Sequence, residues 1–286
     1  MPTDSAMLPI LPRISRLLAS AAVTLFCSQC AFVAPHPLKT ESIKRHQIYT
    51  AADSPVRIPA NLYRPKSSVP TPVVVLIHGG SWTGGDHRWQ MRKIANKLVS
   101  RGYYVMNVTY RTLPEWRYPA PLDDIGAAID WIERNAKNEN IDPTRIALYG
   151  YSAGGHLALL RGLTDSRVSA IIGGSAPTDL AAFGPESAAV RLLGGTPQEH
   201  PDLFREASPL YRVTKDSPPV FLYQGRADTV VPPDQGRRMK AVLNERKIPN
   251  QLMELNRKGH ITAFLFGGAA EDRAIDFLDQ TLKKNP

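Results

Sequence analysis

The stretch YGYSAGGHLALL, residues 149–160, places one serine, Ser152, among glycines and an alanine where two regular elements meet. An apolar strand pattern precedes it at residues 145–150, and a helical pattern follows at 153–163. Glycine in a helix interior costs about 1 kcal/mol, so Gly150 and Gly154 indicate a tight turn where backbones pass closely. The pattern G-x-S-x-G between a strand and a helix is typical of a turn that exposes a nucleophilic serine hydroxyl.

Strand patterns alternate with helical patterns on both sides of this turn. VVVLIH, residues 73–78, is a continuous β-branched and apolar run, as expected for a strand covered on both faces. Further strands are expected at residues 103–110, 145–150, 168–174, 219–225 and 251–255, with edge strands at 46–50 and 57–63. Helices are expected at residues 89–100, 122–136, 153–163, 233–246 and 269–283.

This alternation predicts an α/β fold, with a mostly parallel sheet of about eight strands flanked by helices on both faces. Residues 175–217 interrupt the rhythm, since they carry several prolines and glycines and only short helical pieces, such as 187–193. A loop of this length in a compact domain is usually functional. We therefore expect a small cap over the site there.

A serine hydroxyl is a weak nucleophile and needs a base within hydrogen-bond distance, oriented by a carboxylate. In this architecture the order along the chain is serine, acid, histidine. Two histidines follow the helix after Ser152, and His200 lies in the irregular stretch, which favours a surface position. His260 follows the strand expected at 251–255, in a stretch that we expect to be flexible. His260 is therefore the predicted base.

Asp228 is the predicted acid, because it lies three residues past the end of the strand expected at 219–225. A carboxylate there could reach a histidine on the loop after the next strand. Two alternatives are weaker: Asp179 follows another strand at some distance, and Asp234 has the position of a first-turn helix residue. His156, on the helix after the serine, is expected to pack or to form a structural hydrogen bond.

The loop HGGSWTGGD, residues 78–86, directly follows the strand that ends at Ile77. Its glycines let backbone amides approach a reacting carbonyl, and the amide of Ala153 at a helix N-terminus would be another donor. His78 is expected to hold the loop through hydrogen bonds, and Trp82 to line the substrate pocket together with the cap. Both nucleotide patterns, G-x-x-x-x-G-K-S/T and G-x-G-x-x-G, are missing from the loop. This argues against a phosphate-binding role.

Several segments together resemble the α/β-hydrolase fold, specifically the hormone-sensitive-lipase-like esterases and the related acetyl-esterase or xylan-esterase types. They are HGGSW, YRTLPEWRYPAPLDD, DPTRIALYGYSAGGHLA, GRADTVVP and GHITAF, and they extend from about residue 73 to the C-terminus. The resemblance implies an oxyanion hole formed by the amides of Gly80, Ser81 and Ala153. Glycine is frequent in such esterases where this chain has Ser81, whose side chain would narrow the acyl pocket. We expect the substantial N-terminal cap of many relatives to be missing here, since little more than a strand pair is expected before residue 73.

The resemblance also implies a two-step acyl transfer that needs no metal or organic cofactor. Ser152 would attack the carbonyl, His260 would move the proton and Asp228 would fix the imidazole. The expected substrate is a small short-chain carboxylic ester. An amide hydrolase of the same fold, formamidase- or peptidase-like, is an alternative, because the three side chains serve both reactions. A non-catalytic binding protein that kept the fold is the other alternative, and the complete set of side chains argues against it.

Composition allows a large core and excludes little else: of 286 residues, 43% are hydrophobic and 21% charged. The formal net charge of +9 comes from basic residues spread along the chain. Without a matching motif or interleaved aromatic residues, this charge does not indicate a nucleic-acid partner. Oligomeric state stays open.

The N-terminus predicts a leader at residues 1–30 and a single catalytic domain at 31–286. Arg13 and Arg16 precede a short apolar run at 17–26, typical of a secretory signal and too short to span a bilayer. We expect export, periplasmic or secreted, with a disordered or interfacial N-terminus and a cytoplasmic location as alternatives.

Both cysteines of the chain, Cys27 and Cys30, lie at the end of the apolar run. Lipid attachment to either would tether the protein to a membrane. Because the rest of the chain has no cysteine, the catalytic domain contains no disulfide and suits either redox compartment.

Overall fold

The computed structural model describes residues 43–49 and 55–283. The predicted leader, with Cys27 and Cys30, lies outside the described residues. Within the described ranges, no helix has both the length and the hydropathy needed to cross a membrane.

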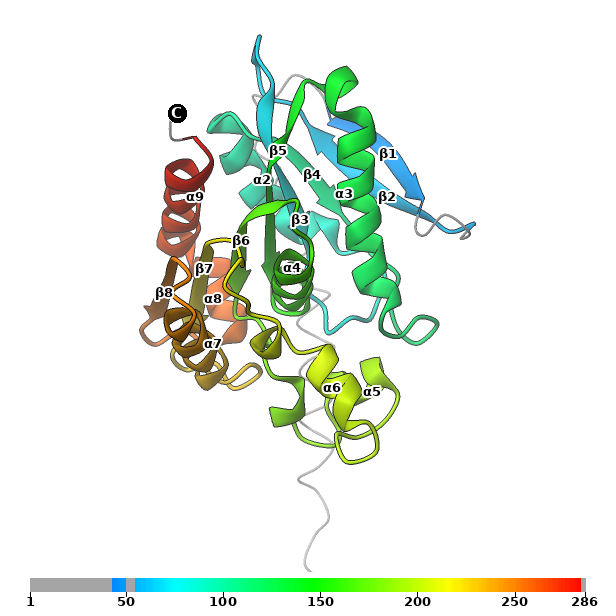
Figure 1. Ribbon diagram of the computed structural model, residues 1–286, viewed down its shortest axis with the longest axis vertical. Coiled ribbons are helices and arrows are strands. Elements are labelled where there is room, and N and C mark those ends of the chain that lie inside the picture. The colour runs from blue at the N-terminus through cyan, green and yellow to red at the C-terminus, as the bar shows by residue number, and fades with distance from the viewer. Residues whose placement is uncertain (1–42, 50–54, 284–286) are drawn as a thin grey trace, which may run out of the picture. The chain divides into compact units, whose positions relative to one another are not determined.

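Eight strands form one sheet in the order β1-β2-β4-β3-β5-β6-β7-β8 (Figure 1). β1 pairs with β2, and β2 with β4, in antiparallel fashion, while all remaining pairs are parallel. The strands are β1 (Ile43–Tyr49), β2 (Arg57–Tyr63), β3 (Thr71–Ile77), β4 (Tyr104–Val108), β5 (Ile141–Tyr151), β6 (Val168–Gly174), β7 (Val220–Gly225) and β8 (Asn250–Leu255). The predicted α/β class with a mostly parallel sheet is confirmed.

β3 lies at the centre of the sheet because its sequence, TPVVVLI, offers apolar side chains to both faces. All seven of its residues are buried, and it pairs with β4 on one side and β5 on the other. β3, β5, β7 and β8 run in the same direction, so the loops that follow all four lie at the same end of the sheet, beyond the carboxyl ends of the strands. Ligands bind at this end in open α/β sheets.

Helices cover both faces of the sheet; α3 and α4 lie in front of it in Figure 1, and α2 behind it. α2 and α9 pack beside each other, joined by the ion pairs Lys97–Asp272 and Arg101–Asp276. The longer helices are α2 (Arg92–Ser100), α3 (Ala120–Glu139), α4 (Ala153–Thr164), α7 (Asp234–Glu245) and α9 (Gly268–Leu282). Each lies within three residues of its predicted ends. In α2, α3, α7 and α9 an apolar stripe marks the buried face, and α4 is apolar along most of its length because it is buried nearly all round.

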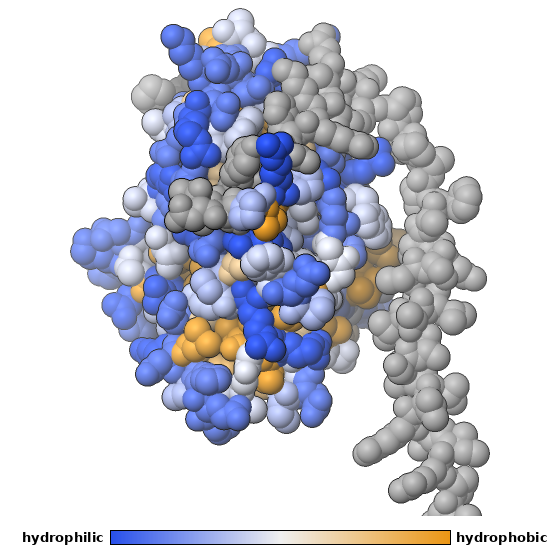
Figure 2. Space-filling view, turned by 90° about the vertical axis from the view of Figure 1, so that its right-hand side faces the viewer, coloured by the Kyte–Doolittle hydropathy of each residue, from blue (hydrophilic) through white to orange (hydrophobic). Residues whose placement is uncertain are grey.

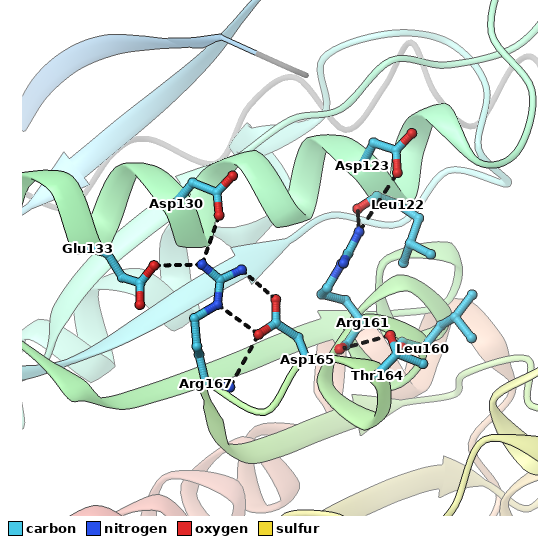
Figure 3. Close-up of polar contacts among 9 residues, drawn as sticks. All are labelled: Leu122, Asp123, Asp130, Glu133, Leu160, Arg161, Thr164, Asp165 and Arg167. Atoms are coloured by element: carbon cyan, nitrogen blue, oxygen red, sulfur yellow. Dashed lines mark hydrogen bonds and ion pairs between the residues drawn. The ribbon is translucent and has the colours of Figure 1, made fainter. Parts of the chain in front are cut away.

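Two arginines from the α4 region hold α4 against α3 (Figure 3). Arg167 donates to Asp130 and Glu133 of α3 at 2.8 and 2.6 Å, and also to Asp165, which follows α4. These acidic partners raise the pKa of Arg167. Arg161 donates to the carbonyl of Leu122 at 2.9 Å. Because α4 begins directly after Ser152, these contacts also fix the helix that carries the nucleophile turn.

The insert at residues 175–217 contains four short helices: η2 (Leu180–Ala182), α5 (Ala188–Leu193), α6 (Pro201–Glu206) and η3 (Pro209–Tyr211). Figure 1 shows α5 and α6 beyond the lower end of the sheet. Figure 2 shows a mostly hydrophilic face, with a hydrophobic area in its lower half at the height of α5 and α6. The insert is tied to the main body by Gln235 of α7, whose Oε1 accepts from the amides of Thr178 and Asp179 at 2.8 Å.

Two local expectations were wrong. β2 is not an edge strand, because it pairs with both β1 and β4. The helix expected at 89–100 begins as a separate 3-10 turn, η1 (Arg88–Met91), before α2. A further short helix, α8 (His260–Phe266), was not expected from the sequence; Thr262 Oγ1 accepts from Gly259 N at 2.8 Å in its first turn.

Candidate active site

Ser152 occupies the turn between β5 and α4 with a left-handed backbone, φ 55° and ψ −122°. A non-glycine residue in this region is strained by about 1–3 kcal/mol. The flanking glycines are required by close approach, because a Cβ at Gly150 would lie 2.0 Å from the Gly154 carbonyl oxygen, and one at Gly154 would lie 2.1 Å from that of Ile77. The predicted tight turn is therefore present, and it packs directly against the end of β3.

The three side chains predicted to act together do meet. Ser152 Oγ lies 2.9 Å from His260 Nε2, and His260 Nδ1 lies 2.8 Å from Asp228 Oδ2. The carboxylate accepts from Nδ1–H, so Nε2 is left without a proton and accepts from the serine hydroxyl. The Asp228 side chain is fully buried and that of His260 is 9% exposed. β5, β7 and β8 each supply one of these groups just after their carboxyl ends.

Asp228 is held by backbone and side-chain donors in addition to His260. Its Oδ1 accepts from the amides of Val230 and Val231 at 3.0 and 2.8 Å. Its Oδ2 also accepts from Gln224 Nε2 at 3.2 Å. Gln224 is buried near the end of β7 and was not singled out from the sequence. A polar residue in the otherwise apolar run VFLYQG was the one available signal.

The competing residues have other partners. Asp179 is buried and pairs with Arg238 at 2.7 Å, and Asp234 is exposed on the first turn of α7. His200 is exposed before α6, as expected. His156 is fully buried, and its Nε2–H donates to the Ala207 carbonyl at 2.8 Å, which confirms the structural role expected for it.

His78 holds the loop after β3 through both ring nitrogens. Nδ1–H donates to the carbonyl of Gly79 at 2.7 Å, and Nε2 accepts from Thr109 Oγ1 at 2.9 Å. The ring also stacks on Tyr110, with centroids 4.6 Å apart. Burial lowers the pKa of His78 to about 4, so the ring is neutral at pH 7 and can both donate and accept.

The loop itself runs alongside the nucleophile. A Cβ at Gly79 would lie 3.3 Å from Ser152 Cβ. Gly80, Ser81 and Trp82 all have positive φ, at 124°, 54° and 57°, and the turn is closed by Thr83 N donating to the Gly80 carbonyl at 2.9 Å. Among the described residues, the amides of Gly80 and Ser81 donate to no other group. Ala153 is the first residue of α4, where amides have no partner within the helix.

Trp82 of this loop is buried. The residue is 3% exposed, and its indole packs edge to face against His156, with ring centroids 5.1 Å apart. The burial of Trp82 places it in the core cluster that continues into the insert through Leu180 and Leu192. Its contact with substrate stays a prediction.

These groups supply the parts of a nucleophilic acyl-transfer site: a hydroxyl, a base on that hydroxyl, a carboxylate on the base and backbone donors beside the hydroxyl. Within the described ranges, no group of three or more His, Cys, Asp or Glu residues is placed to hold a metal ion.

The fold is the α/β-hydrolase fold, as solved structures of similar architecture also show. A truncated carbohydrate esterase from gut microbiota superimposes with a TM-score of 0.78 and 23% identity, over 87% of this chain and 99% of that one. EstE1, a thermophilic carboxylesterase cloned from a metagenomic library, gives 0.72 and 22%, over 88% and 92%.

Within that fold class, the chain belongs to the BD-FAE family, whose model matches residues 60–243. That range includes Ser152 and Asp228 and ends before His260. Among curated proteins, esterase LipC of Mycobacterium tuberculosis is 32% identical over 60% of this chain and 49% of its own length. Esterase LipQ of the same organism is 29% identical over 61% and 46%. The chain thus spans about half the length of these relatives.

Proposed function

We propose that this protein is a serine carboxylesterase that hydrolyses short-chain carboxylic esters through an acyl-enzyme. One observation carries the proposal: the continuous hydrogen-bonded series Ser152–His260–Asp228, next to the amides of Gly80 and Ser81, which have no acceptor in the part of the chain that the structure describes. Membership of the BD-FAE family and the esterase names of its relatives support it.

The first half of the reaction acylates the serine. Ser152 Oγ attacks the ester carbonyl carbon while its proton passes to His260 Nε2, and the imidazolium is stabilised by Asp228. The oxyanion would accept hydrogen bonds from the amides of Gly80, Ser81 and Ala153. His260 then gives the proton to the departing alcohol oxygen, and the C–O bond breaks. The acyl group stays on Ser152.

The second half releases the acid. A water molecule gives its proton to His260 Nε2 and attacks the acyl carbon, and the bond to Ser152 Oγ breaks as the proton returns to that oxygen. The side chain of Ser81 adds bulk at the loop, where glycine is frequent in similar esterases. This favours short acyl groups.

The test is hydrolysis of p-nitrophenyl acetate by the purified protein and two variants. Ser152→Ala should lower kcat by about 10⁶-fold. Asp228→Asn should lower it by about 10⁴-fold, because the imidazole loses the partner that fixes its tautomer. Equal rates for wild type and Ser152→Ala would refute the proposal.

A second panel separates ester from amide hydrolysis. The same enzyme is given esters of graded acyl length and the matching N-formyl and aminoacyl amides. We expect the highest kcat/KM for acetyl and propionyl esters. A preference for amides would reassign the site to a formamidase- or peptidase-like reaction. Failure of a fluorophosphonate to label Ser152 would favour the non-catalytic alternative.

We also infer that the protein is exported. Arg13 and Arg16 before the apolar run at 17–26 support this inference. Mass spectrometry of protein isolated from its native cell should find an N-terminus beyond residue 26. An added lipid mass on Cys27 or Cys30 would identify a membrane tether, and an intact Met1 would contradict export.

A further inference from the structure

The helix that carries His260 is weakly buried. α8 has only seven residues, and Ala263 is its one buried side chain. Ile261, Leu265 and Phe266 are 62%, 48% and 66% exposed. The preceding strand, β8, is the edge strand of the sheet and is half-buried along much of its length. A helix this short is marginal without packing, so specific contacts must fix the position of the imidazole.

One such contact comes from the residue next to the nucleophile. Tyr151, buried at the end of β5, has its hydroxyl 2.6 Å from the His260 carbonyl oxygen and 3.1 Å from Ser175 Oγ. Its ring also packs against the His260 and Phe264 rings, with centroids 5.4 and 4.8 Å away. The tyrosine therefore contacts α8 through its hydroxyl and its ring.

The direction of these hydrogen bonds follows from the number of protons. A carbonyl only accepts, so the single phenolic proton of Tyr151 is donated to His260, and Ser175 must donate to the phenolic oxygen. Ser175 is itself fully buried, with its amide bonded to the Tyr223 carbonyl at 2.7 Å. Burial raises the pKa of Tyr151, so the hydroxyl keeps its proton at working pH. The series Ser175–Tyr151–His260 is thus fully paired.

We propose that Tyr151 is a positioning residue, which fixes the base relative to the nucleophile by donating a hydrogen bond to the His260 carbonyl from the last residue of β5, next to Ser152. This inference rests on the proposed function of the same site. Tyr151 ends β5 and Ser152 follows it directly, so both the serine oxygen and the imidazole are held to the end of the same strand. The packing of α8 alone does not provide this.

Tyr151→Phe removes the hydroxyl and keeps the ring contacts. We expect kcat for ethyl acetate to fall about tenfold, since small displacements of a catalytic group are costly, with KM nearly unchanged. The loss in kcat/KM, which reports acylation, should be smaller with p-nitrophenyl acetate than with ethyl acetate, because p-nitrophenolate leaves without a proton from His260. A role in stability alone would lower both rates equally.

Tyr149→Phe is the matched control. Tyr149 lies two residues earlier on β5 and is also buried, and its hydroxyl lies 3.4 Å from that of Tyr223, with no hydrogen bond to His260 among the described residues. It should keep wild-type kcat on both esters. Ser175→Ala, which removes the second partner of the Tyr151 hydroxyl, should change the ethyl acetate rate in the same direction but less, and it serves if Tyr151→Phe does not fold.

Hydrogen exchange separates this inference from the proposed function. In Tyr151→Phe the amides of residues 260–266 should exchange faster than in wild type and in Tyr149→Phe, whether or not any ester is hydrolysed. An inactive wild type would overturn the proposed function alone. Unchanged exchange in α8, or equal rate losses on both esters, would overturn the role of Tyr151.

Discussion

Each hydrogen bond that the Asp228 carboxylate accepts comes from a donor that is held in place. Two backbone amides bond Oδ1, while His260 and Gln224 bond Oδ2. Gln224 Nε2 also donates to the Val231 carbonyl at 2.8 Å, so it joins the carboxylate to its own loop. A carboxylate held in this way presents one oxygen to the imidazole in a single orientation.

We expect Gln224→Met, which keeps the volume and removes the donor, to lower kcat about tenfold. A hydrogen bond to a charged group is worth about 1.5–3 kcal/mol, and part of that loss appears as a misoriented imidazole. The measurement is kcat on p-nitrophenyl acetate together with urea unfolding. Gln251→Met, on the exposed side of β8, is the control and should match wild type. A Gln224→Met enzyme with full kcat would contradict this role.

At the scale of single residues, the sequence allowed prediction of side chains that come in the expected order along the chain and lie just after the carboxyl end of a strand. Ser152, Asp228 and His260 each follow a strand, so their meeting could be inferred from parallel topology. Gln224 and Tyr151 could not be assigned, because their roles depend on side-chain direction inside the sheet. Tyr151 in particular occupies a variable position of the G-x-S-x-G pattern, which says nothing about its hydroxyl.

At the scale of elements, the junction of β3, β5 and α4 is the tightest contact in the candidate site. Gly154 lets α4 start against the carbonyls of Ile77 and His78. A Cβ at this position would lie 2.1 and 2.4 Å from their oxygens. Backbone atoms cannot move aside without displacing β3.

Gly154→Ala should therefore destabilise the protein by about 3 kcal/mol or more, as overpacking against backbone does, or prevent folding. Gly184→Ala is the comparison, because a Cβ there meets no atom within 4 Å and its φ is ordinary. It should change the free energy of unfolding by less than about 0.5 kcal/mol. Urea unfolding of both variants decides the matter, and similar stabilities would contradict the close packing described for the junction.

Long elements were predictable because burial leaves a pattern in their sequence. The central strands are continuous apolar runs, the helices α3, α7 and α9 carry an apolar stripe, and α4 is apolar nearly all round because it is buried on most sides. α8 was missed because its seven residues, HITAFLF, are mostly apolar although several are exposed, so no amphipathic period marks it. α6 was missed for a similar reason: it is six residues long, with Phe204 as its one buried side chain.

At the scale of the whole molecule, two buried neutral histidines make the free energy of unfolding depend on pH. Burial lowers the pKa of His78 and of His156 to about 4, from an ordinary 6.5. The unfolded chain binds protons at these residues below about pH 6.5 while the folded chain does not. Their contribution to stability is therefore complete above pH 6.5 and is lost as the pH falls towards 4.

The free energy of unfolding should fall between pH 6.5 and 4 by about 1.4 kcal/mol per pH unit for each of these histidines. His156→Gln keeps a donor for the Ala207 carbonyl and removes one titration, so its stability should depend less steeply on pH by about one proton. Urea unfolding at several pH values measures both slopes. Parallel curves for wild type and His156→Gln would contradict the assignment.

The proposed reaction requires a covalent bond between the acyl group of the substrate and Ser152. The direct test is to mix the protein with p-nitrophenyl acetate, quench in acid within the first turnovers and map the peptides by mass spectrometry. We predict an acetyl group on the peptide that contains Ser152, absent in Ser152→Ala and strongly reduced in His260→Ala. Ester hydrolysis at full rate with no acetyl group on Ser152, or with the label on another residue, would contradict the account.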